Sequence, residues 1–240
     1  MTDVRALNDP DHVVRQYETE GGLAARKAVY RDVTGPDPRE IALEAVLEGA
    51  PTVVLEVGCG EGELAERLNA CVPDVVAVDQ SPRMVELTRA RGVDARVADI
   101  QDIPFPDSSF DAVLAAWMLY HVPDLDRGLS EVTRVLRPGG RLVATTNGAE
   151  HLAELLALGG LERWDMPFDG ESAEEILRRR FSSVERRDAA GTVTFHDADL
   201  VRSYFASSER LAGGLDRLPE ALDRPLVARR LPVVFVARVR

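Results

Sequence analysis

The sequence predicts an α/β fold in which a mostly parallel sheet lies between two layers of helices. Apolar runs at 53–57, 75–78 and 110–117 are typical of parallel strands that are buried on both faces. Apolar residues at helical spacing follow the first two runs. The chain has 240 residues, of which 45% are hydrophobic and 29% charged, so one large domain can bury a sizeable core.

Residues 1–50 precede the first strand and are expected to form a helical arm. Apolar residues recur at helical spacing in 13–28 and again in 41–47, and Pro36 and Pro38 separate the two patterns. We therefore expect two helices outside the sheet.

The first apolar run ends in three glycines, Gly58, Gly60 and Gly62, which alternate with other residues. A turn without side chains lets a ligand lie against the backbone. The helix expected at 63–70 presents free N–H groups at its start, where a polar or anionic group can bind. The stretch is therefore typical of a nucleotide-binding turn.

Asp79 closes the second apolar run, nineteen residues after Gly60. A carboxylate at the tip of the second strand is where a ribose hydroxyl pair is held in nucleotide-binding sheets. The glycine pattern is G-x-G-x-G, whereas dinucleotide sites carry G-x-G-x-x-G. An NAD-dependent oxidoreductase is thus an alternative that the spacing disfavours.

The remaining elements follow in order along the chain. Ser81 and Pro82 are typical of a helix cap and a first helical turn. We expect helices at 83–91, 126–136, 151–158, 171–181 and 199–211, and strands at 95–100, 141–145, 184–188, 192–195 and from 231 onward. One domain is expected, with a helical arm at 1–50, a cofactor-binding core at 51–146, and substrate-side elements with the closing strands at 147–240.

Charge and composition exclude several classes of function. The chain has 41 acidic and 29 basic residues, a net charge of −12, which opposes binding to a phosphate backbone. No apolar run approaches a membrane span, and the N-terminus lacks the apolar core of a signal peptide. Two cysteines give neither metal-ligand spacing nor a disulfide framework. We expect a cytoplasmic protein with no metal, nucleic-acid or membrane partner.

The motifs resemble those of one enzyme family. Glu56-Val-Gly-Cys-Gly-Glu-Gly followed by Val-Ala-Val-Asp79-Gln-Ser resembles the first two motifs of the class I S-adenosylmethionine-dependent methyltransferases. The segment that ends in His121-Val-Pro-Asp124 is similar to the group that includes ubiquinone-biosynthesis and other small-molecule enzymes. The resemblance covers roughly 50–146. It implies a Rossmann-like three-layer sandwich with a seven-stranded sheet, an antiparallel last strand beside the fifth, and a helical insertion near the C-terminus.

The resemblance also implies a cofactor, S-adenosylmethionine, which leaves as S-adenosylhomocysteine. The residues it places around that cofactor come from the arm and from the first four strands: Tyr17, Arg26, Glu56, Gly58, Cys59, Gly60, Asp79, Gln80, Met84, Asp99, Ile100, Ala116 and Trp117. Arg26 would meet the methionine carboxylate and Asp79 the ribose, and Asp99 would accept from the adenine amine. Simpler alternatives stay open: a solvated helix face for Arg26, core packing for Met84 and a solvated turn for Asp99.

The substrate side is expected at the ends of the fourth and fifth strands. Candidate substrate residues are Tyr120, His121, Asn147, His151 and Trp164. His121 is the candidate general base, since imidazole titrates near neutral pH, and a structural role for it is the alternative.

The expected reaction is methyl transfer to an O or N atom of a small-molecule metabolite. An acidic chain with apolar and aromatic pocket candidates suits a small organic acceptor. Two alternatives remain: a protein of this fold without catalysis that acts as a partner or regulatory subunit, and methylation of a protein or tRNA. A homodimer is also left open.

Overall fold

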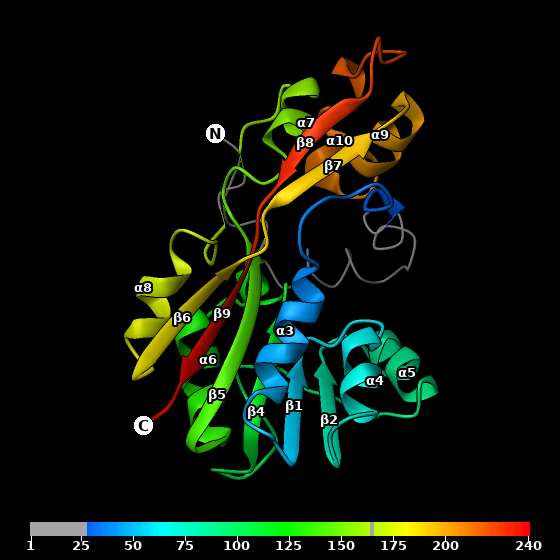
Figure 1. The fold of residues 1–240 in the computed structure, drawn as a ribbon. Coiled ribbons are helices and arrows are strands. Elements are labelled where there is room, and N and C mark those ends of the chain that lie inside the picture. The colour runs from blue at the N-terminus through cyan, green and yellow to red at the C-terminus, as the bar shows by residue number, and fades with distance from the viewer. Residues whose placement is uncertain (1–27, 164–165) are drawn as a thin grey trace.

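The computed structural model describes residues 28–163 and 166–240. Within them, seven strands form one sheet (Figure 1). Their order across the sheet is β3 (Asp94–Val97), β2 (Asp74–Asp79), β1 (Val53–Val57), β4 (Phe110–Ala116), β5 (Leu136–Asn147), β9 (Pro232–Arg238) and β6 (Ser183–Asp188). Neighbours from β3 to β5 pair in parallel, whereas β9 is antiparallel to both β5 and β6. The expected sheet with its antiparallel last strand is confirmed.

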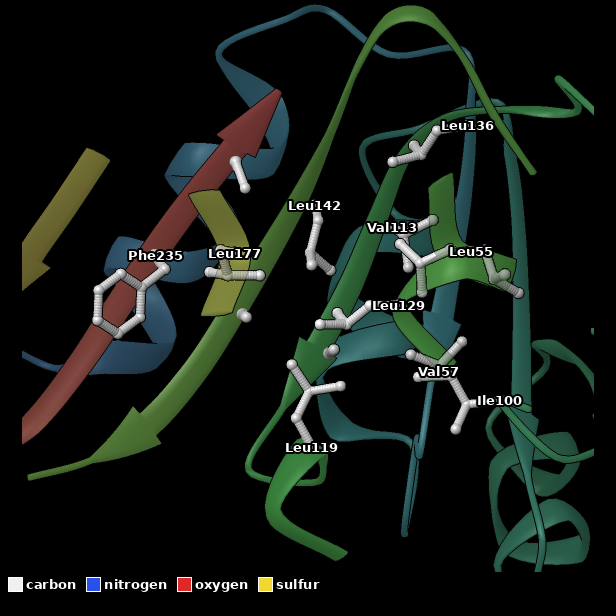
Figure 2. Close-up of a cluster of buried hydrophobic side chains, with 14 of the residues drawn as sticks. Leu55, Val57, Ile100, Val113, Leu119, Leu129, Leu136, Leu142, Leu177 and Phe235 are labelled. Atoms are coloured by element: carbon white, nitrogen blue, oxygen red, sulfur yellow. The ribbon is translucent and has the colours of Figure 1, made fainter. Parts of the chain in front are cut away.

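Helices cover both faces of this sheet. One layer contains α3 (Pro38–Leu47), α4 (Glu63–Asn69) and α5 (Pro82–Ala90), and the other contains α6 (Leu125–Val135) and α8 (Ala173–Arg178). Successive strand residues point to opposite faces, so Val54 packs toward the first layer while Leu55 and Val57 pack toward the second. Figure 2 shows the second cluster, in which Leu129 and Leu177 pack near the sheet residues. The three-layer arrangement follows from strands that are apolar on both faces.

A small second sheet extends from the edge of the main one. It pairs β7 (Gly191–Phe195) with β8 (Leu226–Arg230) in antiparallel register. Figure 1 shows β6 leading into β7, and β8 leading into β9. Each of these two chain segments therefore contributes one strand to the main sheet and one to the small sheet. The segment 32–34 pairs with the free edge of β7, with an isolated bridge between Val33 and Val193.

The second sheet has its own hydrophobic core. The expected helical insertion lies between β7 and β8 and contains α9 (Ala198–Phe205), α10 (Glu209–Ala212) and the 3-10 turn η3 (Leu215–Arg217). Together with α7 (Ala153–Leu158), it packs Leu155, Phe195 and Phe205 into a separate buried cluster. These elements form a cap beyond the carboxyl ends of β4 and β5 (Figure 1).

Several boundaries differ from the expectation. The helix expected at 126–136 ends at Val135, because Leu136 is already extended and pairs with Phe110 in the sheet. The fifth strand therefore begins five residues earlier than the expected 141. The helix expected at 199–211 is interrupted, since Ser208 caps a new helix, α10. Strand β8 was not expected at all.

Two further expectations concern membrane-spanning helices and the helical arm at 1–50. No helix within residues 28–163 and 166–240 is both long and apolar enough to span a membrane. The helical pattern expected before residue 28 lies outside the described residues, so the arm at 1–50 is represented here by α3. The division into arm, core and substrate-side elements stays a prediction.

Candidate active site

The turn after β1 has the backbone conformation that its glycines allow. Gly58, Gly60 and Gly62 have φ angles of 68°, 54° and 77°, in the left-handed region that favours glycine. A Cβ at Gly62 would lie 2.6 Å from the Thr88 hydroxyl oxygen, so close packing against α5 also requires glycine there. A Cβ at Gly60, by contrast, would meet no atom of residues 28–163 and 166–240 within 4 Å. The turn therefore packs tightly against α5 at Gly62 and leaves space beside its middle glycine, Gly60.

Asp79 ties the tip of β2 to this turn. Its two carboxylate oxygens accept hydrogen bonds from the backbone N–H groups of Gly60 and Ser81, each at 2.9 Å. Burial raises the pKa of this carboxyl, while the backbone donors oppose that shift. Each oxygen of a carboxylate has two lone pairs, so both can accept a further hydrogen bond.

Glu56 lies beneath the turn with one oxygen unsatisfied. Its side chain is 2% exposed, and burial followed by the nearby charge of Asp79 raises its pKa to about 8. A backbone hydrogen bond from Ala65 supports the ionised form. Oε2 has no hydrogen-bond partner in the described residues. A buried polar atom without a partner is costly, so this oxygen is suited to meeting a polar group of a ligand.

A cavity of about 740 Å³ opens at the carboxyl ends of β1, β2, β4 and β5. The sheet order reverses between β1 and β4, and ligands of open α/β sheets bind at such switch points. Most of the expected site residues line the cavity: Glu56, Gly58, Cys59, Gly60, Asp79, Gln80, Met84, Ile100, Ala116, Trp117, Tyr120, His121, Asn147 and His151. The fold therefore brings residues from one end of the sheet and from the cap to a single site.

Trp117 follows β4 in an unusual backbone conformation. Its φ of 54° is rare for a large side chain, and such a conformation costs about 1–3 kcal/mol. Two hydrogen bonds hold it, from Trp117 N to the Thr145 carbonyl at 2.9 Å and from its indole Nε1 to Asn147 Oδ1 at 3.3 Å. The turn directs the chain into the 3-10 turn η2 (Leu119–His121), whose Tyr120 and His121 rings lie 4.5 Å apart on the cavity wall.

His151 is a buried, neutral imidazole. Its Nδ1 accepts from the backbone N–H of Leu231 at 2.9 Å, so the ring proton must be on Nε2. Nε2 then donates to the Tyr30 hydroxyl at 3.0 Å. Burial, followed by the charge of Arg230, lowers the pKa of His151 to about 3. His151 is thus a positioning residue for Tyr30, and with Nδ1 already occupied it has no free lone pair for proton abstraction.

Comparison with known proteins agrees with this geometry. The model of a family described as a methyltransferase domain matches residues 55–144. An uncharacterized methyltransferase of Mycobacterium bovis is 34% identical over 132 residues, which cover 50% of this chain and 67% of that protein. The chain belongs to the class I S-adenosylmethionine-dependent methyltransferases.

Other similar proteins extend the comparison. The demethylmenaquinone methyltransferase of Thermus thermophilus is 41% identical over 113 residues, which cover 44% of this chain. The chain spans about half the length of that relative, 51%. The solved structure of the [4+2]-cyclase SpnF superposes with a TM-score of 0.65 at 19% identity, over 95% of this chain and 96% of that one. At that identity the likeness shows the shared fold alone.

Among the described residues, Asp99 is the one expected site residue of this methyltransferase that does not line the cavity. Asp99 is turned into its own loop, where its carboxylate accepts from the backbone N–H of Gln101 at 2.8 Å and from the Gln101 side chain. Its neighbours on the chain do line the cavity. Tyr17, Arg26 and Trp164 lie outside the described residues. Met84 is buried in α5 and also lines the cavity, so core packing and ligand contact are combined in one side chain.

Sequence reasoning missed a second set of lining residues. Tyr30, Arg39, Tyr204 and Arg230 line the cavity from the segment 28–47 and from the cap. None belongs to a local motif. Arg230 reaches the backbone of Thr34 and Pro36, almost two hundred residues earlier in the chain, and no pattern in the sequence signals such a contact.

Proposed function

We propose that this protein binds S-adenosylmethionine in the cavity and transfers its methyl group to an O or N atom of a small-molecule acceptor. One observation carries the proposal: the open backbone of Gly60, the Asp79 carboxylate beside it and Glu56, whose Oε2 has no partner among the described residues, line one cavity. These groups fit the polar ends of such a cofactor. Gly60 leaves space, the Asp79 carboxylate can accept hydrogen bonds from the ribose hydroxyls, and Glu56 Oε2 can accept one from the cationic amine.

The proposed cofactor contacts divide by chemistry. Gly58 and Gly60 would let the methionine part lie against the backbone, and Asp79 would accept from the ribose hydroxyls through its remaining lone pairs. Met84 and Ile100 would pack on the adenine ring. Asp99 would reach the adenine amine only if its side chain turned from its own loop toward the cavity.

The cofactor supplies an activated methyl group on a sulfonium ion. The protein's own contribution is to align the acceptor with that group and to keep water out. Trp117 and Tyr120 lie where they can position an acceptor at the end of β4. His121, on the same wall, is the proposed general base, which takes the proton that the acceptor atom loses.

The cavity supports a small acceptor. Its acceptor side contains the aromatic or thioether side chains of Tyr30, Tyr204 and Met166, which suit a planar organic molecule. The relative named a demethylmenaquinone methyltransferase supports the same class. The net charge of −12 argues against a nucleic-acid acceptor. The expected cytoplasmic location and the homodimer stay predictions.

Calorimetric titration with S-adenosylmethionine and S-adenosylhomocysteine tests the proposal. We expect micromolar binding by the wild type, and loss of binding in Asp79→Ala. Asp74→Ala is the matched control, since Asp74 is an exposed aspartate at the other end of the same strand. Binding that Asp79→Ala retains would contradict the assigned site. No binding of either ligand by the wild type would overturn the function and favour a non-catalytic partner.

A further inference from the structure

Arg230 is a buried cation that forms no ion pair with a carboxylate of the described residues. It is the last residue of β8 and is 5% exposed. Its Nε donates to the Thr34 carbonyl at 2.9 Å, and its Nη2 donates to the Pro36 carbonyl at 2.6 Å. Among the described residues no hydrogen bond involves Nη1, and no carboxylate lies within ion-pair distance of the guanidinium.

The free donors of Arg230 open into the cavity. Nη1 has no hydrogen bond in the described residues and is not fully buried, so solvent can reach it. Arg230 also lines the cavity. Nη1 has two N–H groups and Nη2 has one left after its bond to Pro36. Together they form a fork that matches the two oxygens of a carboxylate.

The nearest acid does not neutralise this charge. Asp37 accepts from Arg39 Nε at 3.1 Å, from Nη2 at 2.9 Å and from the Arg39 backbone N–H at 2.9 Å. Asp37 is therefore paired with Arg39, whose charge Glu63 also faces, and it forms no ion pair with Arg230. Burial lowers the pKa of Arg230, yet a guanidinium stays protonated in proteins. A buried cation without a counter-ion is unfavourable, and a bound anion would offset that cost.

Arg230 lies at the acceptor end of the cavity. It precedes β9, whose Pro232 pairs with Asn147 at the end of β5. From β1 to β9 the sheet advances three strand spacings, roughly 14 Å. The carboxyl groups of Glu56 and Asp79 lie on β1 and β2, so they are at the other end of the cavity from Arg230.

We propose that Arg230 binds a carboxylate of the methyl acceptor, so that this methyltransferase acts on small organic acids. The inference rests on the proposed function, since it assumes that the cofactor occupies the acidic end. Tyr30, held by His151, and the Tyr204 ring lie on the same wall and suit an aromatic body attached to that carboxylate.

The test uses the full chain saturated with S-adenosylhomocysteine, titrated with benzoate and, separately, with neutral benzamide of the same shape. We expect benzoate to bind at least about tenfold more tightly than benzamide. Arg230→Met should remove that preference, and Arg230→Lys should restore part of it. Arg229→Met is the matched control, because Arg229 is exposed and pairs with Glu154 outside the cavity.

The outcomes separate the two proposals. A wild type that fails to bind S-adenosylhomocysteine overturns the proposed function itself. A wild type that binds it, yet takes benzoate no better than benzamide, overturns the carboxylate site alone. Arg230→Met that weakens S-adenosylhomocysteine binding by about tenfold would assign Arg230 to the cofactor's own carboxylate and also overturn the inference. If Arg230→Met does not fold by circular dichroism, the wild-type comparison and Arg230→Lys decide.

Discussion

The backbone N–H of Gly60 donates to the Asp79 carboxylate at 2.9 Å, and this one hydrogen bond joins the tips of β1 and β2. The Thr88 hydroxyl donates to the carbonyl of the same glycine at 3.0 Å. The two peptide groups that flank the Gly60 Cα are thus each held by a hydrogen bond, while the Cα itself faces space free of described side chains. A turn that is rigid and open at once can receive a ligand without rearranging, which reduces the entropy cost of binding.

Substitutions of two glycines in this turn should separate stability from binding. Gly62→Ala places a methyl group against Thr88 at a φ of 77°, so we expect the free energy of unfolding to fall by about 1–3 kcal/mol. Gly60→Ala also carries the cost of a left-handed φ, 54°, but its methyl group meets no atom of the described residues within 4 Å, so its loss of stability should be the smaller of the two. It should weaken S-adenosylhomocysteine binding more than Gly62→Ala does, because the methyl group enters the ligand's space. Urea denaturation and calorimetry measure the two effects. Equal losses of binding in both variants would contradict the distinction.

Glu56 should make the protein less stable as the pH rises. Its pKa is about 8 in the folded protein and 4.5 in the unfolded chain, so between these values the folded state keeps a proton that the unfolded state releases. Unfolding then becomes more favourable by up to about 1.4 kcal/mol per pH unit across that range. Below pH 4.5 the contribution is fully present.

The Glu56→Gln variant checks this dependence. Its amide keeps the shape of the side chain but does not titrate, so its stability relative to the wild type should improve from pH 5 to pH 8. Glu44→Gln, at an exposed position of α3, is the control. Parallel stability curves for Glu56→Gln and the wild type would show that the carboxyl is ionised throughout.

His121 is expected to act in catalysis and not in cofactor binding. His121→Gln should lower kcat for methyl transfer by about 10²–10⁴-fold, since a positioned general base contributes that much. The affinity for S-adenosylhomocysteine should stay that of the wild type. His196→Gln is the control, because His196 is exposed and pairs with Asp32 away from the cavity. A kcat close to that of the wild type would leave His121 with a structural role.

The sequence was sufficient to predict those parts of the candidate site that are formed by residues close together in the chain. The turn, the tip of β2 and the end of β4 were all predicted, because each glycine or acid follows directly on an apolar run that identifies its strand. Asp99 shows the limit of this reasoning. Its place after a strand was right, but its contacts with Gln101 depend on the shape of one short turn, which the pattern does not encode.

The acceptor side could not be predicted for a different reason. Tyr30 meets His151 across 121 residues, and Arg230 meets Thr34 across 196, so both contacts exist only because the cap folds back over the sheet. The short strand β8 has alternating burial but contains two arginines in succession, and one of them, Arg230, points inward. Such a buried arginine is visible only once the long-range pairing is known.

His151 should destabilise the protein as the pH falls. Its pKa is about 3 in the folded state and 6.5 in the unfolded chain, so below pH 6.5 the unfolded state binds a proton that the buried ring does not. The free energy of unfolding should therefore decrease by up to about 1.4 kcal/mol per pH unit from pH 6.5 toward pH 3. His151→Gln, which does not titrate, should lack this part of the acid sensitivity in urea denaturation.

In ¹⁵N spectra of the wild type, the His151 ring should be neutral with its proton on Nε2 at pH 6, as the bond from the Leu231 N–H to Nδ1 requires. An imidazolium signal at that pH would show that Nδ1 carries a proton, and the hydrogen bond to Leu231 would then have to be reassigned.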